Sequence, residues 1–155
     1  MARLPYIDPA TAPEHVRELL ERLPVKLNVF RMMANAESDF RPLVGLGTAI
    51  LGRQKLSPKL RELAILRVAA LERGDIAADA FDPLERAVLR FATEVVRDVR
   101  ASEATFAALA QHLSAREIVE LIVTVGYYMM IARLLETTAV DLDPPAGTKV
   151  VDAIR

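Results

Sequence analysis

The sequence contains no cysteine. Without a thiol there can be no disulfide, no thiolate nucleophile and no thiolate metal ligand, which excludes much redox chemistry. Its two histidines, His15 and His112, lie too far apart in the chain to form a metal-ligand motif. Glycine-rich phosphate loops and nucleophile elbows are missing as well. We therefore expect neither a bound metal nor a cofactor.

An excess of charge is also lacking. The 20 basic and 21 acidic residues give a net charge of -1 and are spread along the chain. This balance leaves no electrostatic footprint for nucleic acid or for an anionic membrane. The first residues carry Pro5, Asp8 and Pro9 where a signal peptide needs an apolar core. The expected location is therefore the cytoplasm.

Apolar residues, by contrast, are abundant. They make up 52% of the 155 residues, and the mean hydropathy is +0.22. The length is that of one domain, which we place at residues 1–155 with irregular tails at 1–12 and 140–155. The apolar surplus is high for a small soluble monomer and predicts a homo-oligomer.

The apolar residues recur at helical spacing, and no segment alternates as a strand does. The sequence therefore predicts an all-α, compact bundle of about six to seven helices. Capping boxes are predicted at Thr11–Glu14, Asp82–Glu85 and Ser114–Glu117, and Ser102 is a predicted N-cap. The helices are expected over residues 14–23, 26–34, 40–52, 58–71, 83–99, 103–113 and 115–138.

The last of these helices is apolar nearly all round, and we expect it to be buried at the centre of the domain. Only 12 residues separate Glu120 from Arg133. A transmembrane helix needs about 20 apolar residues, so burial in protein is favoured over a membrane span.

Glu62 is the leading candidate for acid–base chemistry. It lies on the predicted helix from Ser57 to Leu71, where only Arg67 is charged after it. A carboxylate on so apolar a helix needs either an ion-pair partner or a functional role. A buried carboxyl can exchange protons near neutral pH. The alternative is a structural ion pair of Glu62 with Arg67 or Arg133.

The last helix offers the candidate substrate-binding residues. Tyr127 and Tyr128 can place a hydroxyl at the edge of an apolar wall, although core packing is the commoner use of such residues. Arg133 lies less than two turns further along and can bind a substrate carboxylate.

Three segments together resemble the carboxymuconolactone decarboxylase family, which includes the alkylhydroperoxidase-D-like proteins. They are Leu56–Leu71 with its Arg61-Glu62-Leu63, Asp82–Leu89, and Leu113–Leu135 with its Gly126-Tyr127-Tyr128. The resemblance implies an all-helical fold that assembles as dimers, trimers or hexamers. In the peroxidase branch it also implies a proton relay of a glutamate, a Cys-x-x-Cys pair and a histidine.

Glu62 falls at the glutamate position of this relay, but the rest is missing. The window that should hold the thiols and the histidine contains Gly74 to Phe81, none of which can do thiol or imidazole chemistry. The chain passes from one flank of the window to the other as though a segment had been removed. Relatives also often carry asparagine after the tyrosine pair, where this chain has Met129.

Three functional hypotheses follow. The first is a family member that keeps the scaffold but has lost thiol peroxidase activity. The second is an enzyme similar to the lactone decarboxylases, with Glu62 as proton shuttle and Arg133 or the tyrosines holding a small acidic or lactone-type substrate. The third is a non-catalytic helical oligomerisation module. If the chain is an enzyme, the decarboxylase type is favoured over the thiol peroxidase.

Overall fold

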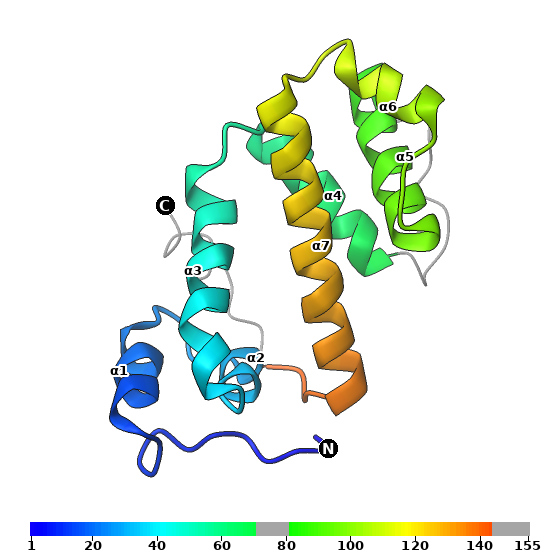
Figure 1. The fold of residues 1–155 in the computed structure, drawn as a ribbon. Coiled ribbons are helices and arrows are strands. Elements are labelled where there is room, and N and C mark those ends of the chain that lie inside the picture. The colour runs from blue at the N-terminus through cyan, green and yellow to red at the C-terminus, as the bar shows by residue number, and fades with distance from the viewer. Residues whose placement is uncertain (71–80, 144–155) are drawn as a thin grey trace. The chain divides into compact units, whose positions relative to one another are not determined.

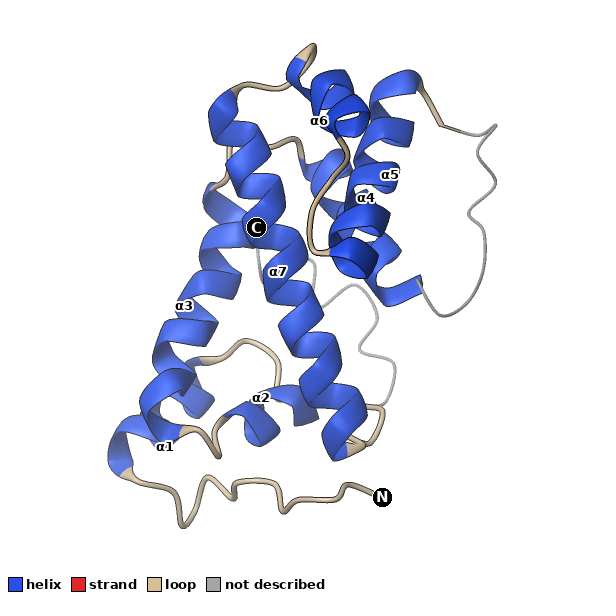
Figure 2. Ribbon diagram, turned by 45° about the vertical axis from the view of Figure 1, so that its right-hand side comes forward, coloured by secondary structure: helices blue, strands red, loops and turns tan. Residues whose placement is uncertain are grey.

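The fold is all-α. The computed structural model describes residues 1–70 and 81–143, and within them it contains helices and no strands (Figures 1 and 2). The predicted stop at 72–75, the linker at 76–80 and most of the C-terminal tail lie outside these residues. The helices are α1 (Glu14–Arg22), α2 (Asn28–Met33), α3 (Glu37–Arg53), α4 (Pro58–Ala70), α5 (Pro83–Asp98), α6 (Glu103–Ala110) and α7 (Ala115–Thr138).

Most helix starts follow the capping residues seen in the sequence. The side chain of Asp82 accepts the Glu85 N–H while Glu85 accepts the Asp82 N–H, which confirms that capping box. Ser114 and Glu117 form the same reciprocal pair before α7. Ser102 accepts from the Thr105 N–H before α6.

Two helices begin differently from the prediction. The capping box at Thr11 is wrong, because the residue before α1 is Pro13 and no side chain caps the helix. Asp8 instead closes a turn by accepting from the N–H groups of Ala10 and Thr11. The other, α3, begins at Glu37, earlier than expected, and therefore carries Pro42 inside the helix.

The chain divides into two compact units, residues 1–52 with 133–155, and residues 53–132. In the first unit, the N-terminal segment is held to the end of α7 and to the residues that follow it. The Arg3 N–H donates to Thr138 O, and the Tyr6 hydroxyl donates to Asp141. Asp143 accepts the N–H of Asn28 at 3.0 Å and so caps α2 from a distant part of the sequence.

The second unit contains α4, α5, α6 and the first three-quarters of α7. Helix α4 packs on α5, and α5 packs on α6. Their buried side chains form one cluster with those of α7. It comprises Leu56, Leu60, Ala64, Val88, Phe91, Ala92, Leu109, Leu113, Ile118, Leu121 and Val125.

The starts of α4 and α7 are tied together. Glu120 on α7 accepts the N–H of the fully buried Leu56 at 2.8 Å. Gln54 donates to Glu120 O and to the Thr124 hydroxyl, both at 3.1 Å. These bonds fix which residues of the two helices lie opposite one another, and this register sets the candidate site.

Helix α7 is less buried than the sequence predicted. Only 22% of the residues in its most apolar stretch are buried, and by length and composition alone it is the one described helix that could cross a bilayer. Its exposed apolar residues Val119, Ile122, Val123 and Met130 follow helical spacing along one side, with the exposed Gly126 between them. We call these five residues the α7 stripe.

Candidate functional site

The candidate site lies in the second unit, where α4 and α7 are neighbours. Helix α4 begins with Pro58 at its first position, which fixes the backbone for a helix without losing a bond. Arg61 and Glu62 follow in its first turns. Helix α7 shares the core cluster with α4 through Leu121 and Val125, and it carries Tyr127 and Tyr128.

Glu62 is exposed, so the expectation of a buried carboxylate is wrong. Helix α4 turns Leu60 and Ala64 into the core, and this leaves the Glu62 position on the outer face. Among the described residues Glu62 forms no ion pair. Its predicted partner Arg67 donates to the Thr93 hydroxyl at 2.8 Å instead.

The tyrosines are half-buried and touch one another edge to face. Their ring centroids lie 5.4 Å apart with planes at 80°. Burial raises the pKa of Tyr128 to about 12, with smaller upward effects from Tyr127 and the Glu62 charge and an opposing effect from Arg61. The charges of Glu62 and Arg61 thus both act on the Tyr128 hydroxyl, which stays protonated through the physiological pH range.

We expect charge changes on α4 to move the Tyr128 titration in opposite directions. Glu62→Gln removes a negative charge and lowers the pKa of Tyr128, whereas Arg61→Met removes a positive charge and raises it. Ultraviolet absorbance of the phenolate, followed against pH in a background that carries Tyr6→Phe and Tyr127→Phe, leaves Tyr128 as the only tyrosine and measures both shifts. Shifts of the same sign in the two variants would contradict this arrangement.

Of the four predicted residues, Glu62, Tyr127 and Tyr128 lie in the second unit, and the charge of Glu62 acts on Tyr128. Arg133 belongs to the first unit. A residue that sequence reasoning did not select, Arg61, lies at the site in its place. Its relative exposure is 8%, and its Nε is enclosed with no hydrogen-bond partner. Little in the sequence indicates this burial, because an arginine beside a glutamate is typical of a solvated helix face.

Two other acidic side chains in the same unit have structural partners. Glu85 is buried and forms an ion pair with Lys59 while it caps α5. Glu120 accepts bonds from Arg116 and from the Leu56 N–H. Within residues 1–70 and 81–143 there is no group of three or more metal-ligating side chains.

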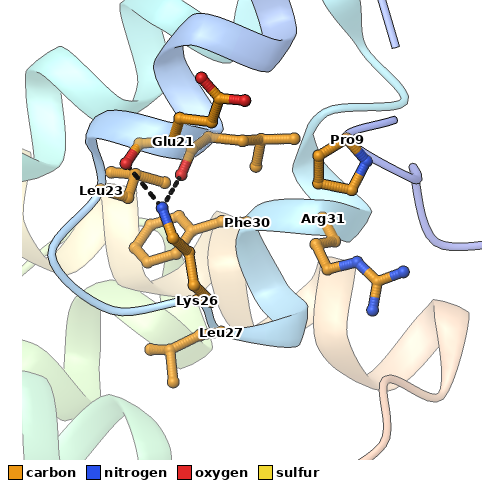
Figure 3. Close-up of a pocket in the computed structure, with 8 residues that line it drawn as sticks. Pro9, Glu21, Leu23, Lys26, Leu27, Phe30 and Arg31 are labelled. Carbon is orange, nitrogen blue, oxygen red and sulfur yellow. Dashed lines mark hydrogen bonds between the residues drawn. The ribbon is translucent and has the colours of Figure 1, made fainter. Parts of the chain in front are cut away.

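The first unit holds a cavity of about 270 Å³ near the end of α1, shown in Figure 3. Its lining is mostly apolar, from residues such as Leu23, Leu27 and Phe30. The Lys26 ammonium donates to the main-chain oxygens of Leu20 and Glu21 at 2.6 and 2.7 Å, as Figure 3 shows. Lys26 thus caps the C-terminus of α1, which accounts for its position without a ligand.

Comparison with known proteins identifies the fold. No protein-family model matches the chain, and no curated protein shows significant sequence similarity to it. Solved structures similar to the chain include the alkylhydroperoxidase AhpD core of an uncharacterized peroxidase-related protein from Ralstonia eutropha JMP134. The two share 20% sequence identity over 92% of each chain, with a TM-score of 0.73.

This similarity confirms the fold expected from the sequence. The chain has the all-α, alkylhydroperoxidase-D-like fold, and its sequence holds no cysteine for a Cys-x-x-Cys relay. At this level of identity the likeness extends to the fold alone. Activity has to be argued from the site.

Proposed function

We propose that the chain is a thiol-independent enzyme that moves a proton on a small acidic or lactone-type substrate. The observation that carries this proposal is the electrostatic effect of Glu62 on Tyr128, a half-buried tyrosine of α7. The two residues come from different helices, and the Glu62 carboxylate is close enough for its charge to act on the Tyr128 hydroxyl. A carboxylate that can shuttle protons beside a neutral phenol that can donate a hydrogen bond is an acid–base pair.

Decarboxylation of a β-keto acid illustrates the chemistry. The bond between the carboxylate carbon and the α-carbon breaks, CO₂ leaves, and the electron pair forms an enolate. Tyr128, which remains protonated, can donate a hydrogen bond to the enolate oxygen. Glu62 delivers a proton to the α-carbon and regains one from water, since it is exposed. No oxidant, reductant or thiol takes part.

The direct test is CO₂ release from a panel of β-keto acids and lactone carboxylates by the purified chain. We expect at least one member of the panel to be turned over above the uncatalysed rate. A chain that leaves every member untouched is not an enzyme of this class.

We also propose that the α7 stripe binds a second copy of the chain. The stripe is apolar, lies on one side of α7 and is exposed in the monomer. The uncharged part of α7, Leu121 to Ala132, is 12 residues long. At about 1.5 Å per residue it is shorter than the ~30 Å hydrocarbon core of a bilayer. A protein surface therefore fits the stripe better than a membrane does.

We expect Ile122→Glu to abolish this self-association, because it places a charge in the middle of the stripe. Light scattering should show an oligomer for the wild type and a monomer for the variant. Phe106→Glu is the matched control, since Phe106 is an exposed apolar residue on α6, outside the stripe. A wild-type monomer, or equal loss of assembly in both variants, would argue against the stripe as the interface.

A further inference from the structure

Arg61 is a charged side chain whose burial should destabilise the folded chain. It is more than nine-tenths buried, and its Nε is fully enclosed without a hydrogen-bond partner. Among the described residues, the guanidinium forms no hydrogen bond and no ion pair. Burying a cation without a partner is unfavourable, so such a group is expected to have a ligand.

The guanidinium is not sealed in. Nε is its only nitrogen that is both enclosed and unbonded, so the two terminal nitrogens keep access to solvent. The inner part of the Arg61 side chain, up to Nε, is therefore buried, while its two terminal nitrogens are accessible to solvent. A guanidinium held in this way presents a planar fork of N–H donors, which matches the two oxygens of a carboxylate.

The neighbours of Arg61 limit which anion can bind. Arg61 lies one turn before Ala64, and Tyr128 lies one turn after Val125, while Ala64 and Val125 share the same core cluster. Glu62 adds one negative charge beside the one positive charge, and Tyr128 is a neutral donor. Two other acids near the start of α4 already have cationic partners, Glu85 with Lys59 and Glu120 with Arg116. This balance favours a monoanion over a phosphate dianion.

We propose that Arg61 is the carboxylate receptor of the candidate site and that the ligand is a small organic monocarboxylate. The inference rests on the proposed function, because it assigns the anchor for the substrate on which Glu62 acts. It replaces Arg133 in that role with a residue on the same helix as Glu62.

Binding is tested with benzoate as the probe and benzamide as the neutral analogue. We expect benzoate, but not benzamide, to raise the melting temperature of the wild type in a dose-dependent way. Arg61→Met should weaken benzoate binding by roughly 10- to 100-fold, the loss typical of a charged hydrogen bond. Arg61→Lys keeps the charge but not the fork and should give an intermediate affinity. Arg100→Met, at an exposed arginine after α5, should bind like the wild type.

A second readout separates a binding role from a structural one. Methionine in place of an unpartnered buried guanidinium removes an unfavourable group, so Arg61→Met should melt at the same temperature as the ligand-free wild type or a few degrees higher. A structural arginine would give the opposite result. A clear fall in melting temperature, or benzoate binding that survives Arg61→Met, would overturn the proposal.

Failure of this inference can be told from failure of the proposed function. Glu62→Gln should keep benzoate binding even though it loses turnover. If acetoacetate is turned over normally by Arg61→Met but not by Glu62→Gln, the proposed function is supported and the assignment of Arg61 as the carboxylate receptor is wrong. The assignment of Arg61 is also wrong if no monocarboxylate of the panel shifts the wild-type melting temperature. It is equally wrong if inorganic phosphate alone shifts it.

Discussion

Replacing Glu62 with glutamine should lower turnover of the best β-keto acid or lactone by about 10²–10⁴-fold, the range for loss of a general acid–base group. Glutamine keeps the shape of the side chain but cannot carry a proton. Glu62 is exposed and has no ion pair among the described residues. Its replacement should therefore change the free energy of unfolding by no more than about 0.5 kcal/mol.

The matched control is Glu136→Gln, an exposed glutamate in the last turn of α7. Both variants are compared by steady-state kinetics and by urea unfolding. Turnover by Glu62→Gln that equals turnover by the control would remove Glu62 from the chemistry. A large loss of stability in Glu62→Gln would instead assign it a structural role.

Replacing Glu120 with alanine should destabilise the fold by about 1–3 kcal/mol, the cost of leaving an enclosed donor unbonded. Glu120 accepts the Leu56 N–H at 2.8 Å and the Arg116 Nε at 2.9 Å. Leu56 is fully buried just before α4, so water does not readily replace the lost acceptor. In a protein of this size, each 1 kcal/mol should lower the melting temperature by about 2–4 °C.

The same carboxylate should make stability depend on pH. Burial pulls the pKa of Glu120 up, but the bonds from Arg116 and Leu56 outweigh it and hold the pKa below its ordinary value of 4.5. The stabilisation from Glu120 is therefore complete above pH 4.5 and is lost as the pH falls through the lowered pKa. Urea unfolding across this range should show a smaller acid loss in Glu120→Ala than in the wild type. Equal loss in both would contradict the assignment.

The helices could be predicted from the sequence because their ends are encoded locally. Asp82 and Ser114 each lie three residues before a glutamate, and both form capping boxes in the structure. Asp143, in contrast, caps α2 from more than 100 residues away. No local pattern reveals a cap of that kind, because it depends on how distant segments meet.

The site was only partly predictable, for a similar reason. The acidic residue and the tyrosines stand out by chemical type, but their burial depends on which face each helix turns inward. Glu62 was expected inside and lies outside, while Arg61 next to it is buried. One residue along a helix is a rotation of about 100°, so a small error in the inferred face reverses the two roles.

Helix α7 shows the limit of composition as a guide. Its apolar character predicted burial, yet the α7 stripe is exposed in the single chain. Periodicity shows which residues share a side of a helix, but not whether the partner on that side is the same chain or another copy. The oligomer and the cytoplasmic location both stay predictions.

The central claim is that this alkylhydroperoxidase-D-like fold carries proton chemistry without a thiol. It is tested most directly by assaying one preparation both for peroxide consumption with a dithiol reductant and for CO₂ release from β-keto acids and lactone carboxylates. We predict background peroxide consumption and CO₂ release that depends on Glu62. Robust peroxide turnover without CO₂ release would contradict the account.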